Sequence, residues 1–152
     1  MQSTTLDASS TSSSNFELED LKVPIQFKLS ALWTSVTLCY LYGDYFGLYR
    51  PGTLQSMLDG MMGPLGPTTQ AVLLGTTILM AIPSLMVVLS LLLWPNANRW
   101  TNVFFGAAYS VIMLISMPGA WAFYQVLGAV EIALTAMVVW YGWNWPKKGA
   151  QL

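Results

Sequence analysis

Two carboxylates stand inside apolar, helix-length runs of the sequence, and chemistry would depend on them first. Asp44 lies in the run that begins near Phe27, and Glu131 lies in the last apolar run. Within a membrane, a centrally placed charge costs about 2.5–3.5 kcal/mol on insertion scales. Such a group is therefore expected to be protonated, paired or in contact with water, and by default it marks a ligand or proton site.

Helical spacing indicates which side chains accompany each acid, because residues three or four positions apart share a helix face. The face of Asp44 holds Tyr40, Thr37, Trp33 and Ser30. The face of Glu131 holds Tyr124, Gly128 and Thr135. Faces rich in hydroxyl-bearing and small residues normally pack against other helices. We expect the two faces to converge on one site inside a bundle, open towards the outside, with Arg50 able to reach back to an acid.

The residue types also limit the chemistry. The chain has no histidine and a single cysteine, Cys39, which we interpret as a packing residue. Histidine-ligated metal or haem sites and an intrachain disulfide are thereby excluded. No phosphate-binding glycine loop, nucleophile elbow or paired-cysteine motif is present. We expect no enzymatic activity, no cofactor and no metal.

A plainer interpretation of the acids stays open beside the functional one. A lone carboxyl group in a helical span can serve as a hydrogen-bond partner for tyrosine or tryptophan, or as a contact between subunits of an oligomer. A ligand or proton site and, less favoured, a catalytic group are the alternatives.

The composition indicates that lipid is the solvent of this chain. Of its 152 residues 55% are apolar and 9% are charged, whereas about 25% are charged in ordinary soluble domains. The net charge of −1 gives no electrostatic reason to expect nucleic acid as a partner.

Four apolar runs reach the length of about 20 residues with which a helix crosses a hydrocarbon core. They extend over residues 27 to 48, 69 to 94, 99 to 117 and 121 to 143. Aromatic residues that suit a membrane interface stand near their ends: Trp94, Trp100, Trp121, Tyr141, Trp143 and Trp145. The sequence therefore predicts an all-α fold, an integral membrane four-helix bundle.

The connections carry further signals. In "RPGTLQSMLDGMMGPLGPT" the residues Leu54, Met57, Leu58 and Met61 have amphipathic helical spacing. We expect a short outer interfacial helix between spans 1 and 2, with Thr53 as its cap and Gly60 near its end; a re-entrant segment is the alternative. The short "MPGA" predicts that the last two spans are antiparallel neighbours.

A proline interrupts the second apolar run. Pro83 is predicted to kink this helix. Ser84 and Thr77 are expected to help the carbonyl groups that it leaves unpaired.

The ends of the chain complete the predicted organisation. Residues 1–22 are interpreted as a disordered Ser/Thr-rich and acidic tail, 23–146 as the four-helix domain, and 147–152 as a short basic tail. Five basic residues fall on one side, Lys22, Lys28, Arg99, Lys147 and Lys148, and Arg50 falls on the other. The positive-inside rule then predicts a multi-pass protein of the cell or inner membrane with both termini cytoplasmic.

Several segments together are similar to one known family: "KLSALWTSVTLCYLYGDYFGLYRPG", "MAIPSLMVVLSL", "NRWTN" and "VEIALT…VVWYGWNWP". The chain resembles, over about residues 23 to 146, a family of small bacterial membrane proteins classed as a domain of unknown function. The family pattern Y-x-x-x-D-x-x-x-L-Y-x-P-G corresponds to Tyr40, Asp44, Leu48, Tyr49, Pro51 and Gly52, and the glutamate of its last span to Glu131. The resemblance implies four spans and no particular activity.

The leading hypothesis is a non-enzymatic integral membrane protein that binds a small or lipid-like ligand, or a proton. The expected site comprises Asp44, Glu131, Tyr40, Tyr124 and Arg50. One alternative is a small proton-coupled transporter acting as a homo-oligomer, and another is a structural or assembly subunit of a membrane complex. The expected partners are the lipid bilayer and further copies of the chain, with no nucleic acid.

Overall fold

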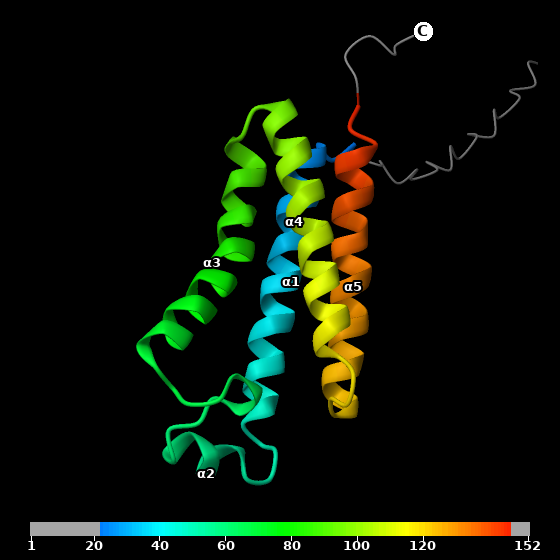
Figure 1. The fold of residues 1–152 in the computed structure, drawn as a ribbon. Helices are drawn as coiled ribbons and strands as arrows, with labels where there is room; N and C mark the ends of the chain where they lie inside the picture. The colour runs from blue at the N-terminus through cyan, green and yellow to red at the C-terminus, as the bar shows by residue number, and fades with distance from the viewer. Residues whose placement is uncertain (1–21, 147–152) are drawn as a thin grey trace, which may run out of the picture.

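The structure, a computed structural model, describes residues 22–146, and within this range it contains four long α-helices and one short one (Figure 1). The helices are α1 (Ile25–Gly47), α2 (Thr53–Leu58), α3 (Gln70–Leu92), α4 (Pro95–Ser116) and α5 (Ala122–Trp143), with a 3-10 turn η1 (Gly63–Leu65). The all-α prediction is confirmed. The interpretations of the two tails lie outside the described residues, apart from Lys22.

The predicted runs agree with the long helices to within a few residues. The largest difference is at α4, which begins at Pro95 and not near Arg99. Proline suits the first helical position, because its fixed backbone angle fits a helix and its missing N–H would be unpaired there anyway. The first turn of α4 is polar, and its residue Asn98 is buried inside the protein. A prediction that counts only apolar residues therefore starts this helix too late.

The helices alternate in direction, so that each end of the bundle collects particular segments (Figure 1). One end holds the start of α1, the α3–α4 connection and the last turn of α5; α2, η1 and the α4–α5 turn lie at the other. Helices α4 and α5 pack closely against each other and are joined by a turn in which Gly119 has a φ of 76°. The prediction drawn from "MPGA" is therefore confirmed.

Helix α1 packs against both α3 and α5, whereas α3 makes few contacts with α4. Figure 1 shows the lower half of α3 leaning away from the other long helices. The long helices therefore pack closely in the order α4, α5, α1, α3, and the packing between α3 and α4 is loose.

The buried positions recur at intervals of three and four residues. In α5 they are Gly128, Glu131, Thr135, Val138 and Gly142. In α4 they are Asn98, Asn102, Gly106, Tyr109 and Met113. This spacing places one stripe of each helix against its neighbour, as in bundles of nearly antiparallel helices.

Two glycines let α4 and α5 approach closely. A Cβ atom added at Gly106 would lie 3.2 Å from the carbonyl oxygen of Thr135, and one added at Gly142 would lie 2.8 Å from Cγ2 of Val103. Small residues at such positions bring helix backbones together, and packing then stabilises the pair.

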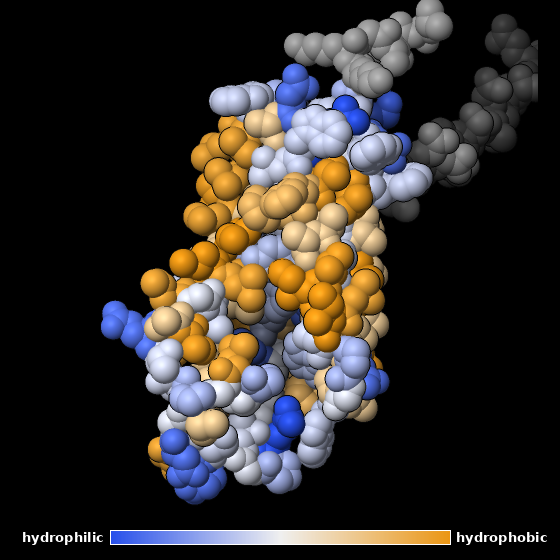
Figure 2. All heavy atoms as spheres, viewed as in Figure 1, coloured by the Kyte–Doolittle hydropathy of each residue, from blue (hydrophilic) through white to orange (hydrophobic). Residues whose placement is uncertain are grey.

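The outer surface is apolar, while several interior residues are polar. Figure 2 shows a band of hydrophobic residues across the middle of the face in view, between more hydrophilic ends. Long apolar side chains such as Leu92, Phe104 and Ile115 are 76%, 67% and 74% exposed, whereas Asn98 and Asn102 are fully buried. This arrangement is the reverse of the one that water favours.

Two helices, α3 and α5, are long and apolar enough to cross a membrane by length and composition. Only 11% and 22% of the residues in their most apolar stretches are buried inside the protein, unlike the core helix of a soluble domain. Membrane association is thus indicated by these two helices, and the prediction of four spans stays a prediction.

Helix α3 continues through Pro83, which has no N–H for the carbonyl group of Leu79 four residues earlier. The hydroxyl group of Tyr109 on α4 donates a hydrogen bond to this carbonyl oxygen at 2.5 Å. Ser84 and Thr77 instead bond the carbonyls of Met80 and Leu73. Ser84 and Thr77 were expected to bond the carbonyl group that Pro83 leaves unpaired. This expectation is wrong, because Tyr109 of another helix donates to the Leu79 carbonyl.

We expect Tyr109→Phe to lower the free energy of unfolding by about 1 kcal/mol, because the Leu79 carbonyl loses the donor that stands in for the missing N–H of Pro83. Titration of the protein with a denaturing detergent, followed by circular dichroism, measures the change. In a Pro83→Ala background residue 83 regains its N–H, so the same substitution should cost less. Tyr42→Phe on the exposed side of α1 is the matched control. Equal losses at Tyr109 and Tyr42 would contradict the assignment.

The short helix between α1 and α3 is confirmed, with one correction. Thr53 is the first residue of α2 and not its cap; Gly52, with a φ of 81°, occupies the capping position, and no side chain caps the helix. Because the chain must turn sharply out of α1, glycine takes the left-handed conformation that threonine would resist. Gly60 follows the helix end with a φ of 73°, as predicted.

Candidate functional site

Among residues 22–146, Glu131 is the only acidic residue whose side chain is buried. It lies midway along α5, its exposed fraction is 2%, and its Oε2 atom is buried with no hydrogen-bond partner. A buried carboxylate normally has partners, since burying an unpaired polar group costs about 1–3 kcal/mol or more. The prediction that Glu131 faces the interior is confirmed, and the orphaned oxygen is a reason to look for a ligand.

Tyrosines from three helices lie near one another, and one of them, Tyr40, lies near Glu131. Tyr40 of α1 lies within electrostatic range of Glu131, Tyr109 and Tyr124. The rings of Tyr40 and Tyr109 are 6.2 Å apart and inclined by 58°. The hydroxyl group of Tyr124 donates to Ser116 at 3.3 Å. Of the predicted site residues, Tyr40 thus lies within range of both Glu131 and Tyr124, and Tyr109 is added beside Tyr40.

Asp44 differs from the expectation. It lies near the end of α1 and is exposed, whereas the preceding residue, Gly43, is buried beside Leu127 of α5. The expectation that this helix face packs against other helices is therefore wrong at Asp44. At this point of α1 the small residue Gly43, and not Asp44, meets α5. The Asp44 charge is nevertheless near enough to interact with Glu131.

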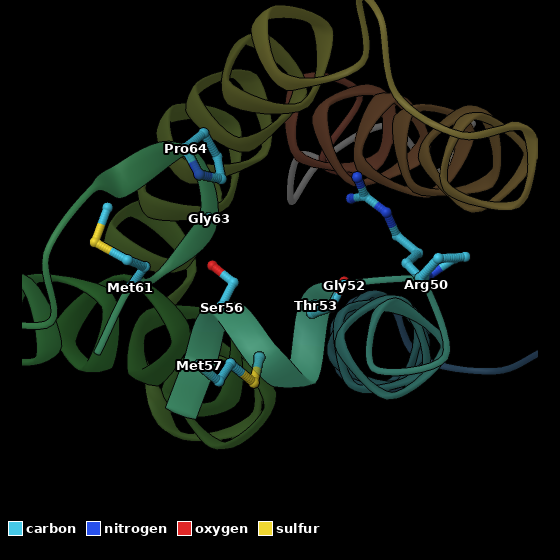
Figure 3. A pocket seen from close by; sticks show the side chains of 9 residues that line it. Arg50, Gly52, Thr53, Ser56, Met57, Met61, Gly63 and Pro64 are labelled. Carbon is cyan, nitrogen blue, oxygen red and sulfur yellow. The ribbon is translucent and has the colours of Figure 1, made fainter. Parts of the chain in front are cut away.

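Arg50 lies beyond the end of α1, at the mouth of the bundle. Its guanidinium carbon is 5.4 Å from the centre of the Trp121 ring, a geometry typical of a cation–π contact. The expectation that Arg50 reaches back to an acid is replaced by this contact. The side chain also borders a cavity of about 420 Å³ whose other walls come from α2 and the η1 turn. Figure 3 shows Arg50 and Ser56 pointing into this space.

The molecule is hollowed on one face. Figure 2 shows a hollow between the lower half of α3 and the α4–α5 pair, with hydrophilic residues visible at its base. The sparse contacts between α3 and α4 account for the hollow. A molecule could therefore approach the interior from the end where Arg50 and α2 lie.

A second polar cluster was not identified as a site from the sequence. Asn102 of α4 accepts hydrogen bonds from Nε1 of Trp33 at 2.7 Å and from the hydroxyl group of Ser90 at 3.3 Å, and it donates to Oδ1 of Asn98 at 2.6 Å. Asn98 in turn donates to the carbonyl oxygen of Ser90 at 2.6 Å. The cluster joins α1, α3 and α4 at the end opposite α2, and its members satisfy one another. Its role is structural.

A signal for this cluster was present in the sequence. Asn98 and Asn102 are one helical turn apart in a membrane-length segment, and such pairs face one side of a helix. Spacing alone could have grouped them, but their partners Trp33 and Ser90 come from other helices and no local pattern names them.

The described residues hold no cluster of three or more His, Cys, Asp or Glu side chains that could bind a metal ion. The acidic groups of the candidate site are two carboxyls, that of Glu131, which is buried, and that of Asp44, which is exposed. They can hold a proton or a group that donates hydrogen bonds.

Taken together, these features define an all-α bundle with an apolar surface, polar side chains in its interior and an unpartnered carboxyl group midway along one helix. The chain belongs to DUF6326, a family of unknown function, and the match covers residues 16–151. The resemblance to a domain of unknown function is thereby confirmed. No curated protein and no solved structure matches the chain.

Proposed function

We propose that this chain is a four-span integral membrane protein that binds a small ligand or a proton at Glu131, with Asp44 nearby. The observation that carries the proposal is the buried, unpartnered Oε2 atom of Glu131 inside a molecule whose outer surface is apolar. An ionisable group at that depth marks function by default, because its burial is expensive.

Spans by α1 and α4 are part of the proposal. Both helices have 22 or 23 residues, enough for a hydrocarbon core of about 30 Å. Their lower apolar content has a structural reason in α4, where Asn98 and Asn102 are buried against other helices. The residues of α4 that lie on the outside, such as Phe104, Val111 and Ile115, are apolar. Lipid therefore meets an apolar face on this helix.

Basic residues support an orientation. Lys28 and Arg99 lie at the end of the bundle that holds the first turn of α1 and the α3–α4 connection, and Arg50 lies at the opposite end. By the positive-inside rule, the Lys28 end is cytoplasmic, and α2 lies at the outer interface with Leu54, Met57 and Leu58 towards lipid.

The proposed activity is binding and not catalysis. The groups within electrostatic range of Glu131 are the Tyr40 hydroxyl, the Cys39 thiol and the Asp44 carboxyl, and none of them is hydrogen-bonded to its Oε2 atom, so this oxygen activates no nucleophile. A proton or a bound donor would satisfy the orphaned oxygen, which accounts for its burial without a chemical step.

Modification by carbodiimides tests the proposal on the full-length protein in lipid vesicles. Dicyclohexylcarbodiimide, which is apolar, should label Glu131, because it partitions into the membrane and reacts with carboxyl groups there. A water-soluble carbodiimide should label Asp59 of α2 and leave Glu131 unmodified. Peptide mass mapping locates the adducts.

The matched controls are Glu131→Gln, which should abolish the apolar label, and Asp59→Asn, which should leave it unchanged. Circular dichroism verifies that each variant is folded. Absence of the apolar label on folded wild-type protein, or equal labelling by both reagents, would refute an intramembrane carboxyl site.

A further inference from the structure

Two cavities share Arg50 as a wall, at the end of the bundle where α2 lies. The larger, of about 420 Å³, is otherwise bordered by α2, through Thr53, Ser56 and Met57, and by the η1 turn. The smaller, of about 330 Å³, lies between the end of α1 and the start of α5, where it is lined by four aromatic residues, Phe46, Tyr49, Trp121 and Phe123. Both volumes fall in the range of about 300–1,000 Å³ that is usual for small-molecule sites.

The larger cavity presents hydrogen-bond donors that the protein itself does not use. The side chains of Arg50 and Ser56 point into it (Figure 3). Neither the guanidinium group of Arg50 nor the hydroxyl group of Ser56 donates to another residue within 22–146. The guanidinium carbon lies 5.4 Å from the centre of the Trp121 ring, and a guanidinium group held over a ring keeps the N–H donors at its edge. The cavity therefore suits a ligand with several acceptor oxygens.

Arg50 also has no acidic partner. The described range contains three acidic residues, Asp44, Asp59 and Glu131, and none of them forms an ion pair with Arg50. Asp59 accepts a hydrogen bond from Gln55 at 3.2 Å, and Glu131 is buried midway along α5. Of these three acids, none lines either cavity. An anionic ligand is therefore favoured there, whereas an ammonium group would find no carboxylate beside it.

The loop that walls the larger cavity has a fixed shape. After α2 the chain turns back on itself, and the N–H group of Met62 donates to the carbonyl oxygen of Gly66 at 2.7 Å. The N–H group of Thr68 donates to the carbonyl oxygen of Gly60, also at 2.7 Å. Gly63, which lines the cavity, has a φ of 53°, a backbone conformation that other residues resist. The backbone of this loop, and not only its side chains, thus builds the cavity.

The smaller cavity adds an apolar surface next to the same arginine. The rings of Phe46 on α1 and Phe123 on α5 have centres 6.4 Å apart and are inclined by 71°. Tyr49 and Trp121 are exposed beside them. Exposed aromatic rings at the end of a membrane-length helix suit the level of the lipid head groups. A hydrocarbon chain can therefore lie against these rings while its head group contacts Arg50.

We propose that these two cavities bind an anionic phospholipid of the outer leaflet. The phosphate group accepts two hydrogen bonds from the Arg50 guanidinium group, whose planar fork matches phosphate oxygens. The hydroxyl group of Ser56 donates to the same head group, and one acyl chain lies along Phe46 and Phe123. The inference rests on the membrane placement given under the proposed function, with α2 at the outer interface, and it is independent of what Glu131 binds.

Native mass spectrometry of the full-length protein in detergent micelles, titrated with single lipids, tests the inference. The probes are phosphatidylglycerol, which is anionic, phosphatidylcholine, which is zwitterionic, and diacylglycerol, which has no phosphate; all three carry the same acyl chains. We expect phosphatidylglycerol to bind about 5-fold or more tightly than phosphatidylcholine, and diacylglycerol to bind most weakly. Glycerol phosphate, which has the phosphate and no chains, should bind more weakly than phosphatidylglycerol, because it buries no apolar surface.

Variants separate the site from the rest of the interface. Arg50→Gln should weaken phosphatidylglycerol binding about 5-fold or more, and Arg50→Lys about 2-fold, because lysine offers a point charge and no planar fork. Lys28→Gln is the matched control: Lys28 also lies over a ring, that of Tyr141 at 5.5 Å, but it lines neither cavity. Phe123→Ala should weaken binding about 3-fold, while Leu54→Ala on the exposed side of α2 should have no effect.

The outcomes distinguish this inference from the proposed function. If folded protein binds phosphatidylglycerol and phosphatidylcholine equally, or if Arg50→Gln and Lys28→Gln bind phosphatidylglycerol alike, the lipid site is wrong, and a carbodiimide label on Glu131 would still support the carboxyl site. If glycerol phosphate binds as tightly as the phospholipid, the ligand is a soluble phosphate and the lipid is wrong. Selective binding that depends on Arg50, found without a label on Glu131, would support the lipid site and refute the carboxyl site.

Discussion

Replacement of Asn102 by leucine should lower the free energy of unfolding by about 2–4 kcal/mol. Leucine has a similar shape and no hydrogen-bonding groups. The substitution therefore leaves Nε1 of Trp33, the hydroxyl group of Ser90 and Oδ1 of Asn98 without their partner in a fully buried position. Each stranded group carries its own desolvation penalty, and three helices lose their common contact.

The measurement is an equilibrium unfolding titration in mixed micelles, followed by tryptophan fluorescence and circular dichroism. Asn96→Leu is the matched control, because Asn96 lies in the first turn of the same helix and is exposed. Trp33→Phe removes one donor and should cost less than Asn102→Leu. If Asn102→Leu and Asn96→Leu are equally stable, the cluster does not hold α1, α3 and α4 together.

The second large effect is expected at the α4–α5 interface, where Gly106→Ala should destabilise the protein by about 1–3 kcal/mol. A Cβ atom there would lie 3.0 Å from Cγ2 of Val139 and 3.2 Å from the Thr135 carbonyl oxygen. The backbone oxygen cannot rotate away as a side chain can, so the helices must separate. Alanine is the better helix former, so the loss would occur despite a favourable local preference.

Two comparisons make this prediction specific. Gly75→Ala on α3 has no atom within 4 Å of the new Cβ, and its stability should be equal to or slightly above that of the wild type. Gly128→Ala meets the terminal Cε atom of Met113, a flexible end that can move, so its cost should be intermediate. The double variant Gly106→Ala/Gly142→Ala should lose less than the sum, because one separation of α4 from α5 relieves both contacts. Equal stability of the Gly106 and Gly75 variants would contradict the close packing.

Much of the fold could be predicted from the sequence because its signals are local. The length of each apolar run predicted the long helices, the spacing of Leu54, Met57 and Leu58 predicted α2, and the shortness of "MPGA" predicted the α4–α5 pair. Each of these features is decided by residues close together in the chain, through helix period, turn length and glycine.

The candidate site could be predicted only in part. Glu131 was recognised as an interior acid, and Tyr40, which was expected beside it, lies within electrostatic range of it. Asp44 is exposed although its position on the helix suggested a packed face. Tyr109 was missed, since nothing near it in the sequence shows that it bonds the carbonyl group of Leu79 on another helix.

The sequence by itself determined that this chain forms four long helices and a short one, that its surface residues are suited to lipid, and that an acid stands midway along the last helix. Only the tertiary structure decided which polar groups have partners. Asn102 is satisfied by Trp33 and Ser90 across two helix interfaces, while Oε2 of Glu131 is not satisfied at all. Helical period fixes which residues share a face. The rotation and tilt of each helix against its neighbours, set by the packing of side chains from distant parts of the chain, fix what that face meets.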